Sequence, residues 1–89
     1  MHRAEALIVN KLGLHARPSA KITQLATRFR AEVWMTKGAR RINAKSIMGV
    51  MMLAAGIGTE VTVETSGERE QEAMDALLAL MADKFGEGE

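Results

Sequence analysis

The only proline of the chain, Pro18, marks where a helix begins. Proline lacks a backbone N–H and is tolerated in the first turn of a helix, where that donor would have no partner anyway. After it, Ile22, Leu25 and Phe29 recur at three- and four-residue spacing, which places them on one apolar face. We therefore predict a helix over residues 16–29.

Alternating apolar and polar residues indicate half-buried strands elsewhere in the chain. The segments with this pattern are residues 3–9, 31–36, 40–44 and 60–65. Their inward-facing residues are predicted to be Ala4, Ala6, Ile8, Val33, Met35, Ile42, Val61 and Val63. Lys37-Gly38 and Ser66-Gly67 are typical of turns that end a strand.

Further helices are predicted over residues 47–53 and 69–84. Ser46 stands where a helix N-cap belongs, because a serine hydroxyl can accept a hydrogen bond from a backbone N–H of the first turn. The last helix is predicted to bury Ala73, Met74, Leu77, Leu78 and Met81. Residues 86–89, Gly-Glu-Gly-Glu, are expected to form a flexible tail.

The predicted order of elements is therefore βαββαβα, in a single domain over residues 1–89. Each element buries its apolar face if helices cover one face of a small antiparallel sheet, which is an α+β two-layer open-faced sandwich. A net charge of +1 gives no field that would recruit nucleic acid or a membrane surface. The absence of cysteine excludes disulfides and thiolate chemistry and fits the cytoplasm, where we expect the protein. No apolar run is long enough to suggest a membrane span.

His15 is the candidate for chemistry, because it lies just before the predicted helix over residues 16–29. Free backbone N–H groups and the positive end of the helix dipole favour an anion there and disfavour an imidazolium. A neutral ring can act as a nucleophile, and Arg17 adds a cation that can contact phosphate oxygens with two N–H groups. On these grounds alone, His15 could equally be a helix cap or a surface imidazole.

Two motifs resemble the histidine-containing phosphocarrier protein (HPr) family of the bacterial phosphotransferase system. Gly13-Leu14-His15-Ala16-Arg17-Pro18 resembles the family's active-site signature. Lys45-Ser46-Ile47-Met48-Gly49-Val50-Met51-Met52-Leu53 is similar to its regulatory-serine segment. The resemblance runs from about residue 4 to residue 83. The two motifs together, at this separation, are a strong indication of the family. It implies a four-stranded sheet with three helices on one side.

The resemblance also implies a mechanism. Nδ1 of His15 would accept a phosphoryl group from the phosphohistidine of Enzyme I, which phosphoenolpyruvate charges, and pass it to a histidine of a IIA component. Arg17 would stabilise the charge in transit. The protein would be a stoichiometric, monomeric carrier rather than a free-standing enzyme, with no metal or organic cofactor. Ser46 would be a regulatory site for a kinase/phosphorylase, although helix capping alone explains a serine there.

Partners are expected to dock around the histidine and on the predicted helix over residues 47–53. The candidate docking residues are Leu14, Ala16, Ser19, Ala20, Lys21, Ile47, Met48 and Met51. On that helix, Val50 and Leu53 should face the core. The alternative is a helix buried all round, because methionine fills irregular cores well. The family often has lysines late in its first helix, whereas this chain has Gln24 and Thr27, which leaves partner preference open.

Two other functions remain open from the sequence. One is a carrier for a nitrogen-related or purely regulatory phosphotransferase branch that moves no sugar. The other is a small α+β module that binds nucleic acid or protein without chemistry. An RNA-binding sheet should display stacking aromatics and a basic face. This chain has three aromatic residues and a net charge of +1, so the second alternative is weak.

Overall fold

Four strands form one antiparallel sheet in the computed structural model, which describes residues 1–89. The strands are β1 (His2–Leu7), β2 (Glu32–Lys37), β3 (Arg40–Asn43) and β4 (Glu60–Ser66). Their order across the sheet is β1-β4-β2-β3. The first strand of the chain, β1, therefore lies at one edge of the sheet, and the last strand, β4, lies between β1 and β2.

The register of the sheet places the predicted inward residues opposite one another. Ala6 pairs with Val61, and Val63 lies between Ala4 on one side and Met35 on the other. Of these, Ala4 is partly buried and the rest are buried, which confirms the predicted inward face of these strands. Regular alternation was therefore enough to assign the buried face.

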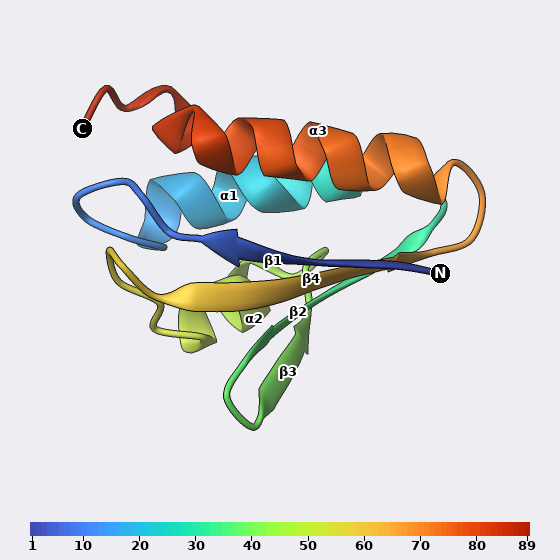
Figure 1. Ribbon diagram of the computed structural model, residues 1–89, viewed down its shortest axis with the longest axis horizontal. Helices are drawn as coiled ribbons and strands as arrows, with labels where there is room; N and C mark the ends of the chain where they lie inside the picture. Colours follow the sequence, from blue (N-terminus) through green and yellow to red (C-terminus); the bar gives the residue numbers. More distant parts are fainter.

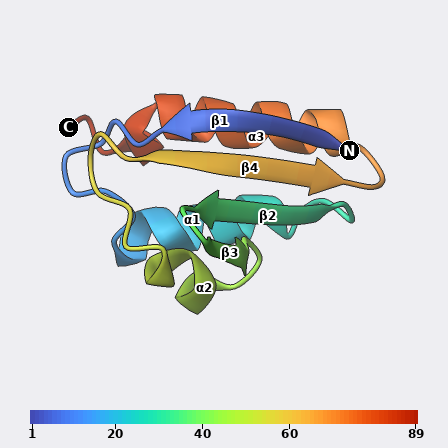
Figure 2. The same cartoon turned by 60° about the horizontal axis from the view of Figure 1, so that its bottom comes forward.

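Three α-helices accompany the sheet, as predicted. They are α1 (Ala16–Ala26), α2 (Ile47–Met52) and α3 (Glu70–Ala82), and a 3₁₀ turn, η1 (Lys84–Gly86), follows α3. Figure 2 shows α1 and α3 behind the sheet, with α3 behind β1 and α1 behind β2, while α2 lies beside α1 near β3. The predicted α+β two-layer fold is confirmed.

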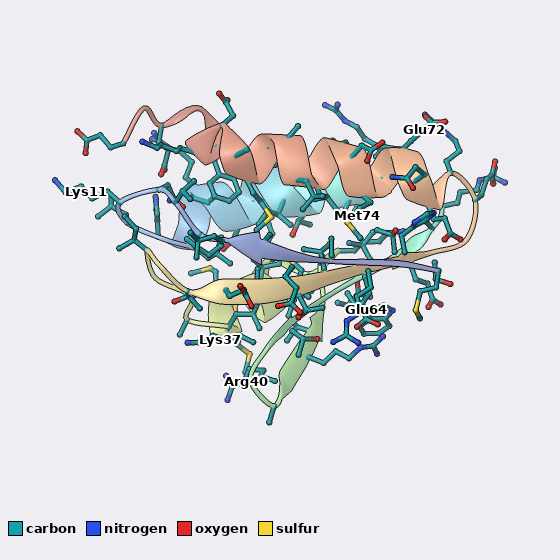
Figure 3. All side chains as sticks on the ribbon, in the orientation of Figure 1. Lys11, Lys37, Arg40, Glu64, Glu72 and Met74 are labelled. Atoms are coloured by element: carbon teal, nitrogen blue, oxygen red, sulfur yellow. The ribbon has the colours of Figure 1, made fainter.

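A single core fills the space between these layers. Figure 3 shows Met74 directed from α3 towards the sheet, whereas Glu72 points away from it. Seventeen buried residues form one cluster drawn from three strands, the helices and the η1 turn. Phe85 of η1 is among the largest fully buried side chains, and it closes the core after α3 ends. Leu78, predicted to be buried, is only partly so.

Helix α1 is shorter than the sequence predicts, because it ends at Ala26 rather than at Phe29. The N–H groups of Arg28 and Phe29 donate to carbonyls three residues earlier, which tightens the last turn and ends the helix. The ring of Phe29 lies instead under the guanidinium of Arg69, whose Cζ is 5.1 Å from the ring centre. A three- and four-residue period continues through such a turn, so the sequence pattern does not show the helix end.

One end of the molecule gathers the loop before α1, the loop before β4 and the C-terminal residues, at the left of Figure 1. Backbone hydrogen bonds join them: Leu14 N–H donates to the oxygen of Ala55 at 2.9 Å, and Lys11 N–H to the oxygen of Glu89 at 2.9 Å. Figure 3 places Lys11 at the tip of this end. None of the helices has the length and apolar character needed to cross a membrane.

Candidate functional site

The loop before α1 is held tightly by a glycine. Gly13 has a φ of +67°, and a Cβ built on it would lie 2.5 Å from the carbonyl oxygen of Ala55 and 2.7 Å from Cα of Gly56. The same Ala55 oxygen accepts the hydrogen bond from Leu14 N–H. Only a residue without a side chain allows this close approach. The loop therefore fixes the backbone two residues before His15.

His15 occupies the N-cap position of α1, as predicted. Its backbone is extended (φ −76°, ψ −172°), and its carbonyl oxygen accepts the 3.1 Å hydrogen bond from Ser19 N–H. The imidazole makes no capping hydrogen bond, so the backbone caps the helix while the ring stays available. The side chain is 36% exposed. His15 is therefore the N-cap residue by its backbone alone, and its ring lies partly exposed at the helix mouth.

Glu87 holds one nitrogen of that ring. Its Oε2 lies 2.8 Å from His15 Nε2, and its Oε1 accepts a 3.0 Å hydrogen bond from Nδ2 of Asn10. The structure shows no hydrogen bond to the other ring nitrogen, Nδ1. The Gly-Glu-Gly-Glu pattern of residues 86–89 predicts a flexible tail, and nothing in it points to a contact of Glu87 with Asn10 or His15. No local sequence pattern predicts a contact between residues that are 72 positions apart.

The Glu87 carboxyl is held in its charged form. Burial by itself would raise its pKa, but hydrogen bonds from Asn10 and His15, together with the charges of His15 and Arg17, bring the net pKa below the ordinary glutamate value. A negative charge therefore stands beside Nε2 under neutral conditions, on the side of the ring away from Nδ1.

Arg17 lies in the first turn of α1 with an exposed side chain. It borders a shallow pocket of about 150 Å³ whose other lining residues are Lys11, Leu12, Glu87 and Glu89. The structure shows no hydrogen bond or ion pair between its guanidinium and another residue. Its donors are therefore available to a ligand that approaches the helix mouth.

Ser46 is the N-cap of α2, as predicted. Its Oγ accepts a 3.1 Å hydrogen bond from Gly49 N–H, and the residue is exposed. Next to it, Ile47, Met48 and Met51 are 43%, 71% and 40% exposed, whereas Val50 is fully buried. The alternative of a helix buried all round is therefore wrong.

Met52, which is 54% exposed and was not among the predicted docking residues, widens this surface. Met48 and Met52 are four residues apart and so are neighbours on one helix face, a signal that could have revealed it. We call Ile47, Met48, Met51 and Met52 the α2 patch. It is a surface of apolar, mostly flexible side chains without a partner in the structure.

Two of the predicted docking residues are corrected by the structure. Leu14 is 5% exposed and belongs to the core, and Ser19 is fully buried with its hydroxyl donating to the carbonyl oxygen of Leu14. Neither side chain is accessible to a partner in this conformation. Ala16 is exposed, and Ala20 and Lys21 are partly buried, with Lys21 Nζ donating to the carbonyl oxygen of Phe85. No group of three histidine, cysteine or acidic side chains could hold a metal ion.

Comparisons with known proteins agree on the class. The family described as "PTS HPr component phosphorylation site" matches residues 2–83. The phosphocarrier protein HPr of Cupriavidus necator is 65% identical over the full length of both chains. The crystal structure of an HPr from Thermoanaerobacter tengcongensis has a TM-score of 0.94 at 44% identity and covers 98% of each chain. A second structure from that organism, described as an HPr dimer, has a TM-score of 0.79 and covers 98% of this chain and 100% of its own.

The fold, the helix-mouth histidine and these matches define a phosphocarrier of the phosphotransferase system. More narrowly, the chain belongs to the HPr family.

Proposed function

We propose that His15 accepts a phosphoryl group on Nδ1 from the phosphohistidine of Enzyme I and passes it to a histidine of a IIA component. The observation that carries this proposal is the state of the ring. Nε2 is engaged by Glu87 at 2.8 Å, while Nδ1 has no hydrogen-bond partner at the exposed mouth of α1. A nucleophile needs an accessible lone pair, and Nδ1 is the ring nitrogen that has one.

Transfer between two such histidines needs stabilisation of the negative charge on the phosphoryl oxygens. Phosphoryl transfer depends mainly on positioning and on electrostatics of this kind. Backbone N–H groups of Ala16 and Arg17 have no intrahelical partner in the first turn of α1. The Arg17 guanidinium is free of protein partners and would add a fixed positive charge beside them. No metal and no organic cofactor enters this scheme.

We further propose that the protein works as a monomer in the cytoplasm. It would be a stoichiometric carrier, which takes one phosphoryl group and gives it up again, rather than a free-standing enzyme. Its complexes must dissociate after each transfer, so small interfaces are expected. The α2 patch lies next to Ser46, and α2 packs against α1, which carries the histidine at its mouth. This patch, together with Ala16, Ala20 and Lys21, is the docking surface that we propose for Enzyme I and IIA components.

The test of the function is the intact mass of the protein after incubation with phosphoenolpyruvate and Enzyme I. We expect a gain of one phosphoryl group that acid removes. Addition of a IIA component should then discharge the carrier. A protein that keeps its original mass under these conditions, with an authentic HPr charged in a parallel reaction, would contradict the proposal.

The docking surface is tested by Met48→Asp. Because Met48 is 71% exposed, the variant should melt at the wild-type temperature. The residues whose substitution costs more than about 1 kcal/mol of binding cluster at the centre of an interface, and an aspartate buried there would also lose its hydration, so we expect affinity for Enzyme I to fall at least roughly fivefold. Leu7→Asp is the matched control, since Leu7 is 52% exposed but lies in β1. Equal affinity of Met48→Asp and wild type in calorimetry would exclude Met48 from the interface.

We also propose that Ser46 is a regulatory phosphorylation site for an ATP-dependent kinase/phosphorylase. Its exposed hydroxyl is adjacent to the α2 patch, and a phosphate there would bring a charge of roughly −2 beside Ile47. Such a charge opposes burial of the patch against a partner.

Ser46→Asp is expected to keep the melting temperature, because aspartate is as good an N-cap as serine. Phosphorylation of His15 by Enzyme I should nevertheless slow by roughly tenfold, about 1.4 kcal/mol in the barrier. Ser46→Ala, which adds no charge, is the control. The rate of His15 phosphorylation by Enzyme I is measured in both variants by quenching the reaction at a series of times. Equal rates in Ser46→Asp and Ser46→Ala would leave helix capping as the only role of Ser46.

A further inference from the structure

We propose that Glu87 is a positioning residue for His15, whose carboxylate keeps the ring proton on Nε2 and so presents the Nδ1 lone pair to the phosphoryl donor. This inference rests on the proposed function and deepens it, because it assigns to the Glu87 carboxylate the task of setting the ring tautomer on which that function depends. It starts from a contact, the 2.8 Å approach of Glu87 Oε2 to His15 Nε2. A neutral imidazole has one N–H, and the nitrogen that faces a carboxylate is the one that carries it.

The carboxylate is itself held in place. The Glu87 side chain is only 14% exposed, and its second oxygen accepts the hydrogen bond from Asn10 Nδ2 at 3.0 Å. Both oxygens therefore have partners, one in the loop before α1 and one on the ring. A carboxylate bound at both oxygens has little freedom to turn away from Nε2.

Asn10 fits this role better than a general structural one. It is fully buried, and its Nδ2 also donates to the carbonyl oxygen of Gly13 at 2.8 Å, so Nδ2 contacts both Glu87 and the loop that leads to His15. Its Oδ1 is buried without any hydrogen-bond partner. An unsatisfied buried acceptor is unfavourable, so the two donor contacts must offset a penalty that an apolar residue would not incur.

The backbone conformation of residues 84–86 places the Glu87 carboxylate beside His15. Lys84, Phe85 and Gly86 all have positive φ values, of 55°, 57° and 75°, which turn the chain sharply after α3. Positive φ is unfavourable for lysine and phenylalanine, and the fully buried Phe85 ring supplies the compensating contacts. Glu87 follows two residues after this anchor, and the Glu89 carbonyl accepts the hydrogen bond from Lys11 N–H. The contact with His15 thus lies between two fixed points.

The position of the ring proton during phosphoryl transfer shows what the contact between Glu87 and His15 does. Nδ1 attacks the phosphorus of the donor phosphohistidine, the new N–P bond forms as the donor N–P bond breaks, and the leaving electron pair stays on the donor nitrogen. With the proton on Nε2, the phosphorylated His15 ring carries a positive charge that the adjacent Glu87 carboxylate stabilises. When the group passes on, the electron pair returns to Nδ1 and the proton remains on Nε2. The His15 ring neither gains nor loses a proton in either step.

The experiment compares Glu87→Gln with Glu89→Gln. Both remove one negative charge from the tail, but the Glu89 carboxylate lies 3.9 Å from Lys11 Nζ and makes no contact with the ring. In Glu87→Gln, one terminal group is NH₂, so the side chain cannot accept from both Asn10 and His15. The ¹⁵N shifts of the His15 ring, measured in the free protein at about pH 8.5, well above the reference histidine pKa, report which nitrogen carries the proton.

We expect wild type and Glu89→Gln to show protonated Nε2 and unprotonated Nδ1, and Glu87→Gln to shift towards a mixture of both tautomers. Transfer from Enzyme I should slow roughly tenfold in Glu87→Gln only, the low end of what a lost partner of a histidine ring costs in metal sites. Unchanged ring shifts in Glu87→Gln, or faster transfer, would overturn the proposal. If wild type accepts no phosphoryl group at all, the proposed function fails, while the ring shifts of the unphosphorylated proteins still decide whether Glu87 positions His15.

Discussion

His15→Ala is expected to take up no acid-labile phosphoryl group from phosphoenolpyruvate and Enzyme I. The alanine side chain has no nucleophile, and no other residue at the mouth of α1 can replace the ring. The fold should remain intact at a modest cost in stability. The imidazole makes no capping hydrogen bond and is partly exposed, but its hydrogen bond with the Glu87 carboxylate is lost, so we expect the free energy of unfolding to fall by about 2 kcal/mol. Intact-mass spectrometry and thermal melting measure the two effects separately.

The matched control is His2→Ala, which removes the second histidine of the chain. His2 lies in β1, and its Nε2 is 3.5 Å from Oε2 of Glu70 at the start of α3. It therefore makes no contact with the mouth of α1. This variant should be phosphorylated at the wild-type rate. Phosphorylation that survives in His15→Ala but disappears in His2→Ala would move the acceptor to the other histidine.

The features that were predicted correctly from the sequence are those that depend on patterns of neighbouring residues. Alternation gave the buried face of β4, proline and a three- and four-residue period gave the start of α1, and a serine ahead of a short apolar run gave the cap of α2. His15 at the N-cap follows from its place three residues before Pro18, which puts the proline in the first turn of α1. Each of these depends on residues within one turn or one strand, where spacing alone determines which side chains share a face.

The features that it missed depend on contacts between distant parts of the chain. Glu87 lies in a Gly-Glu repeat that looks unanchored, and its partner His15 is 72 residues away. Its anchor is Phe85, whose burial depends on a backbone turn with positive φ that a phenylalanine rarely adopts. The resemblance placed Ser19 on the docking surface, but the packing of α1 onto the core decides which side of that helix faces outwards.

Gly13→Ala is expected to be the most destabilising small substitution near the site. The new methyl group would lie 2.5 Å from the carbonyl oxygen of Ala55, well inside van der Waals contact, and the clash is with backbone rather than with a movable side chain. Alanine at a φ of +67° adds a conformational cost of about 1–2 kcal/mol. Overpacking typically adds a further 1–3 kcal/mol. The free energy of unfolding should therefore fall by about 3 kcal/mol.

Two other glycines separate these contributions. Gly38 has a φ of +59°, and a methyl group added there would meet nothing within 4 Å, so Gly38→Ala carries the conformational cost alone, about 1–2 kcal/mol. Gly56 has neither a positive φ nor a neighbour within 4 Å, and Gly56→Ala should change stability by less than about 0.5 kcal/mol. Urea unfolding of the three variants should give the order Gly13→Ala, Gly38→Ala, Gly56→Ala from largest loss to smallest.

The same substitution of Gly13 should also slow phosphoryl transfer under conditions where the protein remains folded. The Ala55 oxygen that the methyl group would displace is the acceptor for Leu14 N–H, so relief of the clash must move the backbone next to His15. A shift there changes the direction of Nδ1 relative to the N–H groups at the mouth of α1. We expect the transfer rate of folded Gly13→Ala to fall by roughly tenfold, while Gly38→Ala transfers at the wild-type rate. A folded Gly13→Ala with wild-type transfer would show that the loop before α1 supports stability without positioning the ring.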